Sequence, residues 1–409
     1  MGKIVFDERN IPKMQITVSN RASTLKPSAI REIFKSLTDP SVISFAAGNP
    51  SPESFPVEDM QRFANDIFEN EANTALQYSI TEGYIPLRSA ILERQKRKFN
   101  IGKEHDTVLV MTGGQQGIEH TCKMLCNEGD TVICEEPTFI GALNAFRSYG
   151  CRLAGVPMDD DGINIEKLEQ ACKDNPNAKI IYLIPTFQNP TGKTMSLEKR
   201  IACLEIAKKY GLFILEDNPY GELRFSGNDV PTIKSMDTEG RVIYCSSFSK
   251  ILSAGMRVGF LLLHEDIAGK IAILKQISDV HTNIFFQMMC HKFLTEYDLD
   301  AHIEKIKRLY GRKAGLMLKC LDESMPEGFT YTRPDGGLFI WGDMPKTVDP
   351  KAFIRELTEN KLAVVPGATF MCDGDAVCHG FRMNYSTPSD EQIIKGVDIL
   401  ATVAKRNLK

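Results

Sequence analysis

"KIIYLIPTFQNPTGKTMSLEKRIACLEIAKKYGLFILED" (residues 179–217) contains two short apolar runs separated by a helix-like segment. The runs 179–185 and 211–217 are almost continuously apolar, which is typical of strands covered on both faces. The segment 196–210 opens with Ser196 and carries Glu198 two residues later, a common start for a helix. A strand, a helix and a second strand in this order predict a parallel βαβ unit.

Five further apolar runs extend this pattern, at 107–114, 131–137, 151–157, 241–247 and 258–263. After about residue 290 the pattern changes to a long charged helix (299–321) and a hairpin-like pair of runs (329–342). We therefore predict an α/β fold with a mostly parallel, seven-stranded sheet in a large domain and a smaller α+β domain after it. The expected boundaries are an N-terminal arm with one helix (1–55), the large domain (56–295) and the C-terminal domain (296–409).

The composition is that of an ordinary globular protein, with 409 residues, 43% hydrophobic, 25% charged and a net charge of −4. This balance gives no electrostatic reason to expect a nucleic-acid partner or an anionic membrane surface. No apolar run approaches the roughly 18 residues of a membrane span, and the first residues lack the apolar core of a secretion signal. Eleven cysteines without an export signal predict reduced thiols in a cytoplasmic protein.

Cys122 and Cys126 are four residues apart and would share one face of a helix. A metal-binding pair is one interpretation of this spacing. No matching second pair follows it, so we expect these side chains to be buried as small apolar groups, without a metal site.

Ligands of open α/β sheets gather beyond the carboxyl ends of the strands. "TGGQQG" (112–117) follows the first run, where small residues let a helix N-terminus approach an anion, although a plain turn explains it equally well. Asn189, in the turn sequence "NPTG", supplies an amide for a ligand oxygen. Asp217 ends a buried strand, where its charge needs a partner such as a cationic ring nitrogen; a helix cap or a local salt bridge is the alternative.

"SSFSKILSAGMRVGF" (246–260) follows another predicted strand. Ser247, Ser249 and Arg257 are suitable donors for a phosphate. Lys250 beside this positive charge has one route to a lowered amine pKa and to Schiff-base chemistry, although most lysines are merely solvated charges. With Phe139 as a stacking ring, the groups after these strands are those that pyridoxal phosphate requires.

Almost end to end, the chain resembles a fold type I pyridoxal-phosphate-dependent aminotransferase of the class I/II family, on "TGGQQG", "EPTF", "QNPTG", "EDNPYG" and the lysine stretch. The resemblance implies Lys250 as the Schiff-base lysine and proton shuttle, with Asp217 on the pyridinium nitrogen. It implies Asn189 and Tyr220 on the ring hydroxyl oxygen and Phe139 over the ring. The implied phosphate contacts are Gly113, Gly114, Gln115, Ser247, Ser249 and Arg257. Gly114, where serine is frequent, removes one hydroxyl.

Three more motifs of the resemblance concern substrate and assembly. "HGFRMNYS" implies that Arg382 holds the substrate α-carboxylate, and "FAAGNPSP" implies Gly48 and Asn49 at the substrate. "LQYSITEGYIPLR" implies that Tyr78 reaches the phosphate of a neighbouring subunit. If so, the protein is a homodimer with shared active sites.

"LKPSAIREIFKSL" (25–37) resembles the N-terminal helix of the 2-aminoadipate/kynurenine branch, which implies that Arg31 meets the substrate side chain; an ordinary exposed charge is the alternative. The expected reaction moves an amino group between an L-amino acid of the glutamate, 2-aminoadipate or aromatic type and a 2-oxo acid such as 2-oxoglutarate. A β-lyase or other pyridoxal-phosphate chemistry on the same scaffold is one alternative. A non-catalytic, cofactor-binding regulator is another, and the roughly 25 residues before the enzyme-like region are too few for the winged-helix domain of such regulators.

Overall fold

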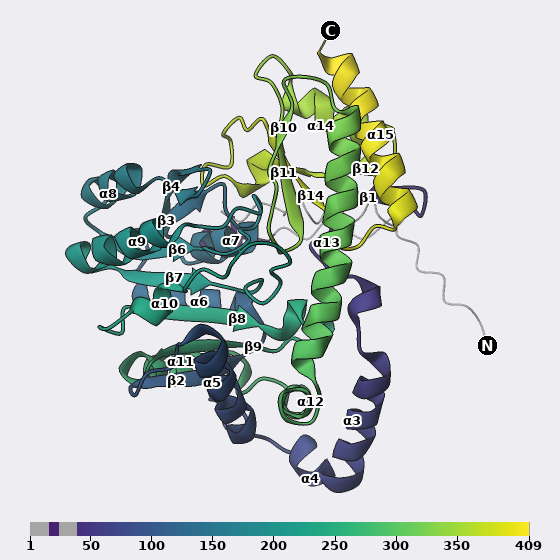
Figure 1. Ribbon diagram of the computed structural model, residues 1–409. Coiled ribbons are helices and arrows are strands. Elements are labelled where there is room, and N and C mark those ends of the chain that lie inside the picture. Colours follow the sequence, from purple (N-terminus) through teal and green to yellow (C-terminus); the bar gives the residue numbers. More distant parts are fainter. Residues whose placement is uncertain (1–15, 24–38, 409) are drawn as a thin grey trace.

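The computed structural model describes residues 16–23 and 39–408. Its large sheet has the strand order β2-β9-β8-β7-β6-β3-β4-β5 (Figure 1). The seven predicted runs all form strands of this sheet, and the two-residue β5 adds an edge beside β4. The strands are β2 (Asp106–Met111), β3 (Thr131–Glu136), β4 (Arg152–Asp159), β5 (Gly162–Ile163), β6 (Ala178–Leu183), β7 (Phe213–Asp217), β8 (Val242–Ser247) and β9 (Gly259–His264).

Five neighbouring strands, from β4 through β3, β6 and β7 to β8, are parallel. β9 is antiparallel to both β8 and β2, so β2 runs in the same direction as the parallel strands. The helix between β6 and β7 begins at the predicted cap, because the Ser196 side chain accepts a hydrogen bond from the Lys199 N–H. It ends at Gly211, whose φ of 69° lies in the left-handed region that favours glycine. The predicted mostly parallel α/β sheet is confirmed.

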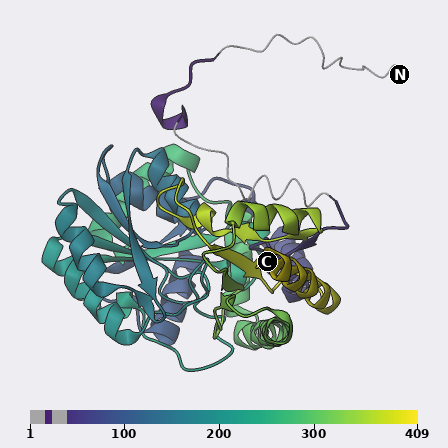
Figure 2. The same ribbon diagram turned by 90° about the horizontal axis from the view of Figure 1, so that it is seen from above.

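Helices cover both faces of this sheet (Figure 2). Along β2 the side chains alternate: Leu109 and Met111 pack in the core under α6, whereas Val108 and Val110 pack in the core under α5. The helices of the large-sheet region are α5 (Ile85–Phe99), α6 (Gly114–Leu125), α7 (Ile140–Ser148), α8 (Ile165–Asp174), α9 (Leu197–Tyr210), α10 (Ile233–Met236), α11 (Glu265–Asp279) and α12 (Ile284–Thr295). Burial on both faces explains why the strands are apolar throughout.

The C-terminal domain contains an antiparallel sheet of order β10-β11-β14-β13. Its strands are β10 (Thr330–Tyr331), β11 (Phe339–Asp343), β13 (Val365–Pro366) and β14 (Gly380–Asn384), and its helices are α13 (Leu299–Ser324), α14 (Pro350–Glu359) and α15 (Asp390–Asn407). The predicted long helix and hairpin are α13 and the β10–β11 pair. In Figure 1 the long α13 stands between the large sheet and α15.

The N-terminal segment contributes to both parts of the molecule. β1 (Ile43–Ser44) pairs in parallel with β12 (Leu362–Ala363), close to the C-terminal sheet. The chain then forms α3 (Val57–Asn70) and α4 (Ala72–Ala75), which pack against α12. A short helix, α1 (Asn20–Ser23), precedes them. The predicted helix 28–37 lies outside the described residues.

Within residues 16–23 and 39–408, none of the helices has the length and apolar character needed to cross a bilayer.

Candidate active site

A cavity of about 480 Å³ lies at the carboxyl ends of the large-sheet strands. Its walls come from the loops after β2, β3, β6, β7 and β8, from the N-terminal segment and from β14 of the C-terminal domain. The predicted residues that line it are Gly48, Asn49, Gly114, Gln115, Phe139, Asn189, Asp217, Tyr220, Ser247, Ser249, Lys250, Arg257 and Arg382. The fold thus joins residues spread over more than 300 positions in one site.

Neighbouring parallel strands bring three of the predicted groups together. Asp217 is the last residue of β7, Lys250 lies in the 3-10 turn after β8, and Asn189 lies in the loop after β6. The fully buried Arg200 of α9 fastens that loop, because its guanidinium donates hydrogen bonds to the carbonyl oxygens of Pro185 (2.8 Å) and Met195 (3.0 Å). The strand order therefore places an amine, a carboxylate and an amide around one cavity.

Lys250 points its amine toward the N-terminal segment, where Nζ donates a hydrogen bond to the Gly48 carbonyl oxygen over 2.8 Å. Burial, followed by the positive charges of Arg382 and Arg257, lowers the pKa of Lys250 to about 8. The negative charge of Asp217 opposes this shift. A sizeable share of the amine is therefore neutral and nucleophilic close to physiological pH.

Asp217 is 5% exposed, and burial raises its pKa to about 6. The Tyr182 hydroxyl donates a hydrogen bond to Asp217 Oδ2 over 2.7 Å. In the described part of the chain this carboxylate makes no ion pair. A buried carboxylate without a cation is costly, so the site suits a cationic ring nitrogen.

Arg382 lies in the middle of β14 and is 3% exposed. Its Nη1 donates to Asn189 Oδ1 (2.9 Å) and its Nη2 to the Ala46 carbonyl oxygen (2.7 Å), whereas the buried Nε has no hydrogen-bond partner. The guanidinium also lies over the Phe339 ring, 4.3 Å from its centroid. Burial lowers the pKa of Arg382 to about 10. No carboxylate of the described chain pairs with it, so the guanidinium is available to an anionic ligand.

The start of α6 and the turns after β8 form an anion cradle at the cavity. Helix α6 begins at Gly114, directed at the cavity, and Gly113 precedes it with a φ of 76°. A Cβ on Gly113 would clash with the Arg257 guanidinium, which lies against this turn. Nearby, the Ser247 hydroxyl donates to the Ser249 hydroxyl over 2.8 Å. Backbone N–H groups, hydroxyls and a guanidinium converge here as a phosphate requires.

Two aromatic residues complete the walls. Tyr220 is buried, which raises the pKa of its hydroxyl, and its ring meets Phe339 edge to face at 5.8 Å. Phe139 lies next to α7, where the Gln115 amide donates a hydrogen bond to the Gly141 carbonyl oxygen over 2.8 Å. The cavity therefore has an aromatic wall, a buried carboxylate, an amine and an anion cradle. Pyridoxal phosphate, a ring with a basic nitrogen, an aldehyde and a phosphate, fits this set of groups.

Of the predicted residues that the structure describes, Gly113 and Tyr78 do not line the cavity; Gly113 lies one residue before Gly114, which does. Tyr78 is 81% exposed, and its ring contacts His281 at 5.9 Å. Arg31 lies outside the described residues.

Other residues of the site were not predicted. Tyr182 is the polar residue among the buried positions of β6, a signal that marks it for a buried hydrogen bond. Phe339, under Arg382, carries no comparable signal, because an aromatic residue in a strand is most often core packing.

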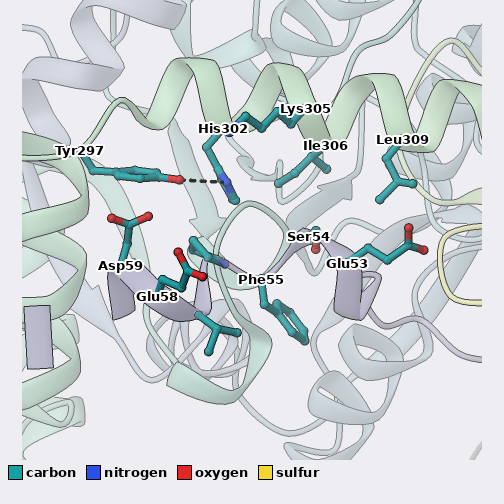
Figure 3. Close-up of a pocket in the computed structure, with 12 residues that line it drawn as sticks. Glu53, Ser54, Phe55, Glu58, Asp59, Tyr297, His302, Lys305, Ile306 and Leu309 are labelled. Atoms are coloured by element: carbon teal, nitrogen blue, oxygen red, sulfur yellow. Dashed lines mark hydrogen bonds between the residues drawn. The ribbon is translucent and has the colours of Figure 1, made fainter. Parts of the chain in front are cut away.

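A second cavity, of about 550 Å³, lies between the start of α3 and α13 (Figure 3). His302 projects into it, and its Nε2 lies 3.1 Å from the carbonyl oxygen of Ile251, next to the candidate lysine. The carboxylates of Glu53 and Asp59 at this cavity already pair with neighbouring cations. Its lysine, Lys305, is exposed to solvent, and the described residues around this cavity include no buried carboxylate without a partner, so we place the chemistry in the first cavity.

Comparisons with known proteins agree with this geometry. Residues 40–400 match the family "Aminotransferase class I and II". Aromatic-amino-acid aminotransferase 1 of Thermococcus litoralis is 39% identical over 395 residues, which are 96% of this chain and 94% of that protein. The crystal structure of the multiple substrate aminotransferase of Thermococcus profundus superposes with a TM-score of 0.92 at 37% identity, covering 96% of this chain and 98% of the other.

A third relative was solved with a ligand. It is LysN, an alpha-aminoadipate aminotransferase of Thermus thermophilus, complexed with N-(5'-phosphopyridoxyl)-L-leucine. Its TM-score is 0.87 at 36% identity, with 96% of this chain and 98% of that chain covered. The chain described here belongs to the aminotransferase class I and II family and is a pyridoxal-phosphate-dependent aminotransferase.

Proposed function

We propose that this aminotransferase moves the amino group of glutamate, 2-aminoadipate or an aromatic amino acid to a 2-oxo acid such as 2-oxoglutarate, with Lys250 as the catalytic base. The single observation that carries the proposal is the cavity itself, where Lys250, Asp217, Arg382 and the anion cradle meet. The named activities of the relatives, toward aromatic amino acids and alpha-aminoadipate, support this choice of substrates.

The residues that would hold the cofactor follow from the groups around the cavity. The phosphate would lie against the N-terminus of α6, with Gly113, Gly114 and Gln115, and beside Ser247, Ser249 and Arg257. Asp217 would meet the ring nitrogen, Asn189 and Tyr220 the ring hydroxyl, and Phe139 the ring face. When bound, pyridoxal phosphate supplies an electron-withdrawing ring that accepts the electron pair left at the substrate Cα.

Lys250 is the proton carrier of the proposal. Its lowered pKa of about 8 leaves enough neutral amine to remove a proton from the substrate Cα, and the resulting ammonium returns a proton in the next step. Asp217 stays ionised when a cation faces it, because a nearby positive charge offsets the cost of its burial. Tyr182 fixes the carboxylate through its hydroxyl.

Arg382 orients the substrate. The two Nη atoms of its guanidinium donate hydrogen bonds to the Asn189 side chain and the Ala46 carbonyl oxygen, and Nε has no partner. We expect the substrate α-carboxylate to bind this guanidinium in a bidentate way, with Gly48 and Asn49 beside it. Desolvation at this depth strengthens that interaction and excludes amines that lack a carboxylate.

Arg31 would select the side chain of the substrate. A second cation that faces the distal carboxylate favours glutamate and 2-aminoadipate, while its alkyl stem and planar head still accommodate an aromatic ring. The test compares kcat/KM for 2-aminoadipate and leucine in wild type and Arg31→Ala. We expect the variant to lose most of its preference for 2-aminoadipate and to retain leucine turnover; an unchanged ratio would reject this role for Arg31.

We also propose a homodimer in which Tyr78 completes the cavity of the other subunit. Tyr78 is exposed, and its ring contacts His281. Exposed apolar side chains lie near both residues in the sequence: Leu76, Ile80 and Ile85 around Tyr78, and Ile273, Ile277 and Val280 before His281. An apolar surface of this kind is typical of a protein interface.

A reducing compartment, the cytoplasm, suits the eleven cysteines, all of which are free thiols. A β-lyase on the same scaffold would release pyruvate and ammonia from a cysteine conjugate. Measuring the ammonia that the purified enzyme releases from such a conjugate tests this alternative, because transamination conserves the amino group and elimination releases it as ammonia.

A further inference from the structure

Three cysteine thiols meet at the end of α6 that lies away from the active-site cavity. Every pair of the Sγ atoms of Cys122, Cys126 and Cys151 is within 4.8 Å, and those of Cys122 and Cys151 are 3.6 Å apart. Among the described residues, no other group of three or more potential metal ligands comes together in this way. Sequence spacing paired Cys122 with Cys126, but the third thiol comes from a different segment.

The backbone fixes the third thiol beside the other two. Cys126 caps the C-terminal end of α6, one helical turn after Cys122. The loop that follows is bonded to the segment before β4, because the Gly129 N–H donates to the Gly150 carbonyl oxygen and the Arg152 N–H to the Asp130 carbonyl oxygen, both over 2.9 Å. Cys151 lies between these two bonds, so its position does not depend on side-chain packing alone.

The sulfur spacing matches that of a metal site. A tetrahedral Zn²⁺ with Zn–S bonds of about 2.3 Å places its sulfurs about 3.8 Å apart. Cys122 and Cys151 are buried, whereas Cys126 is half-buried and leaves an entry path from solvent.

We propose that Cys122, Cys126 and Cys151 bind one Zn²⁺ as three thiolates, with a water molecule at the fourth, solvent-facing position. Three thiolates around Zn²⁺ leave a net charge of −1. Cu⁺ in the same place would leave −2, which is the less favourable charge in a half-buried site near the Asp130 carboxylate. Binding of Zn²⁺ by three thiolates releases the protons of the thiols, so affinity rises with pH.

The site is separate from the transamination chemistry. Helix α6 has 12 residues between its N-terminus at the cavity and Cys126, a length of about 18 Å. The proposal therefore does not rest on the proposed function, and its failure would leave the active-site account unchanged.

The test titrates the cofactor-loaded enzyme, kept reduced with a phosphine, with Zn²⁺ in competition with a chromophoric chelator. We expect one tightly bound Zn²⁺ per chain and a loss of affinity of roughly a hundredfold in both C126S and C151S. C320S removes a half-buried cysteine of α13 outside the cluster and should bind as wild type does. Co²⁺ in place of Zn²⁺ should show the visible bands of a tetrahedral thiolate site, absent in C151S.

Two results would overturn the proposal. One is Zn²⁺ affinity that is the same in wild type, C126S and C151S, which would leave the cluster as apolar packing. The other is a Cys122–Cys151 disulfide that forms on exposure to oxygen with equal speed whether or not Zn²⁺ is present, because a bound metal protects its thiolates. Intact-mass measurement and peptide mapping detect the disulfide and locate it, whereas the Zn²⁺ titration detects the first result.

Discussion

The Tyr182 hydroxyl donates a hydrogen bond to Asp217 Oδ2 over 2.7 Å, between two neighbouring parallel strands. It holds a carboxylate that burial would otherwise drive toward its neutral form. The strand pair thus keeps the Asp217 carboxylate buried, where a cationic ligand offsets the desolvation cost of its negative charge. The arrangement sacrifices some stability of the ligand-free protein for binding of the cofactor ring.

Asp217→Asn should stabilise the ligand-free protein while it abolishes transamination. Because the folded-state pKa is raised from 3.8 to about 6, the ionised carboxylate disfavours folding, and this penalty grows as pH rises through that window and is complete above it. The shift corresponds to at most about 3 kcal/mol at pH 8. Urea unfolding of wild type and D217N at pH 5 and pH 8 tests this. A stability difference that is the same at both pH values would contradict it.

Lys250 should capture an aldehyde with a pH dependence centred near its lowered pKa of about 8. The neutral amine is the nucleophile, so the rate rises with pH up to that value and then levels off. The measurement is covalent labelling of residue 250 in the cofactor-free protein with pyridoxal, trapped by cyanoborohydride and read by peptide mapping, with K250R as the control that cannot be labelled at this position. A midpoint near 10, as for a solvated lysine, would show that burial and Arg382 do not act on this amine.

Arg382→Lys and Arg257→Lys should separate substrate binding from cofactor binding. Loss of the bidentate fork at 382 lowers kcat/KM by roughly a hundredfold, about 3 kcal/mol, with little change in cofactor affinity. The same replacement at 257 lowers the affinity for the cofactor and leaves the KM for the substrate nearly unchanged once the enzyme is saturated with cofactor. Steady-state kinetics at several cofactor concentrations decide between these effects, and an exchange of the two phenotypes would refute the assignment.

Tyr78→Ala and Lys250→Ala should complement each other if active sites are shared. Each variant alone is nearly inactive, but a mixed dimer joins an intact Lys250 to an intact Tyr78 in one of its two sites. Random exchange restores roughly a quarter of the wild-type sites. Activity of the mixture that equals the mean of the two parents would mean that Tyr78 acts within its own chain or not at all.

The sequence predicts most of the large sheet and the groups at its edge. Seven apolar runs become seven strands, because strands covered on both faces need apolar side chains at nearly every position. The groups after those strands gather in one cavity, since parallel neighbours end at the same edge. The resemblance contributed Arg382 and Gly48, which local patterns alone did not single out.

Contacts across distant segments were beyond prediction from the sequence. Nothing near Cys151 marks it as a partner of Cys122, because the pairing depends on how the loop before β3 meets the segment before β4. The Phe339 ring under Arg382 likewise depends on the register of β11 and β14. The strand β1 was missed because two residues carry too little pattern to identify a strand.

The visible absorption spectrum of the cofactor-loaded protein, before and after addition of L-glutamate, tests the central claim most directly. We predict a yellow absorption band that bleaches with glutamate and returns with 2-oxoglutarate, and that neither change occurs in K250A. A band that does not respond to glutamate or to any other amino acid would contradict transamination at this site. Absence of the band after addition of pyridoxal phosphate would contradict the role of Lys250.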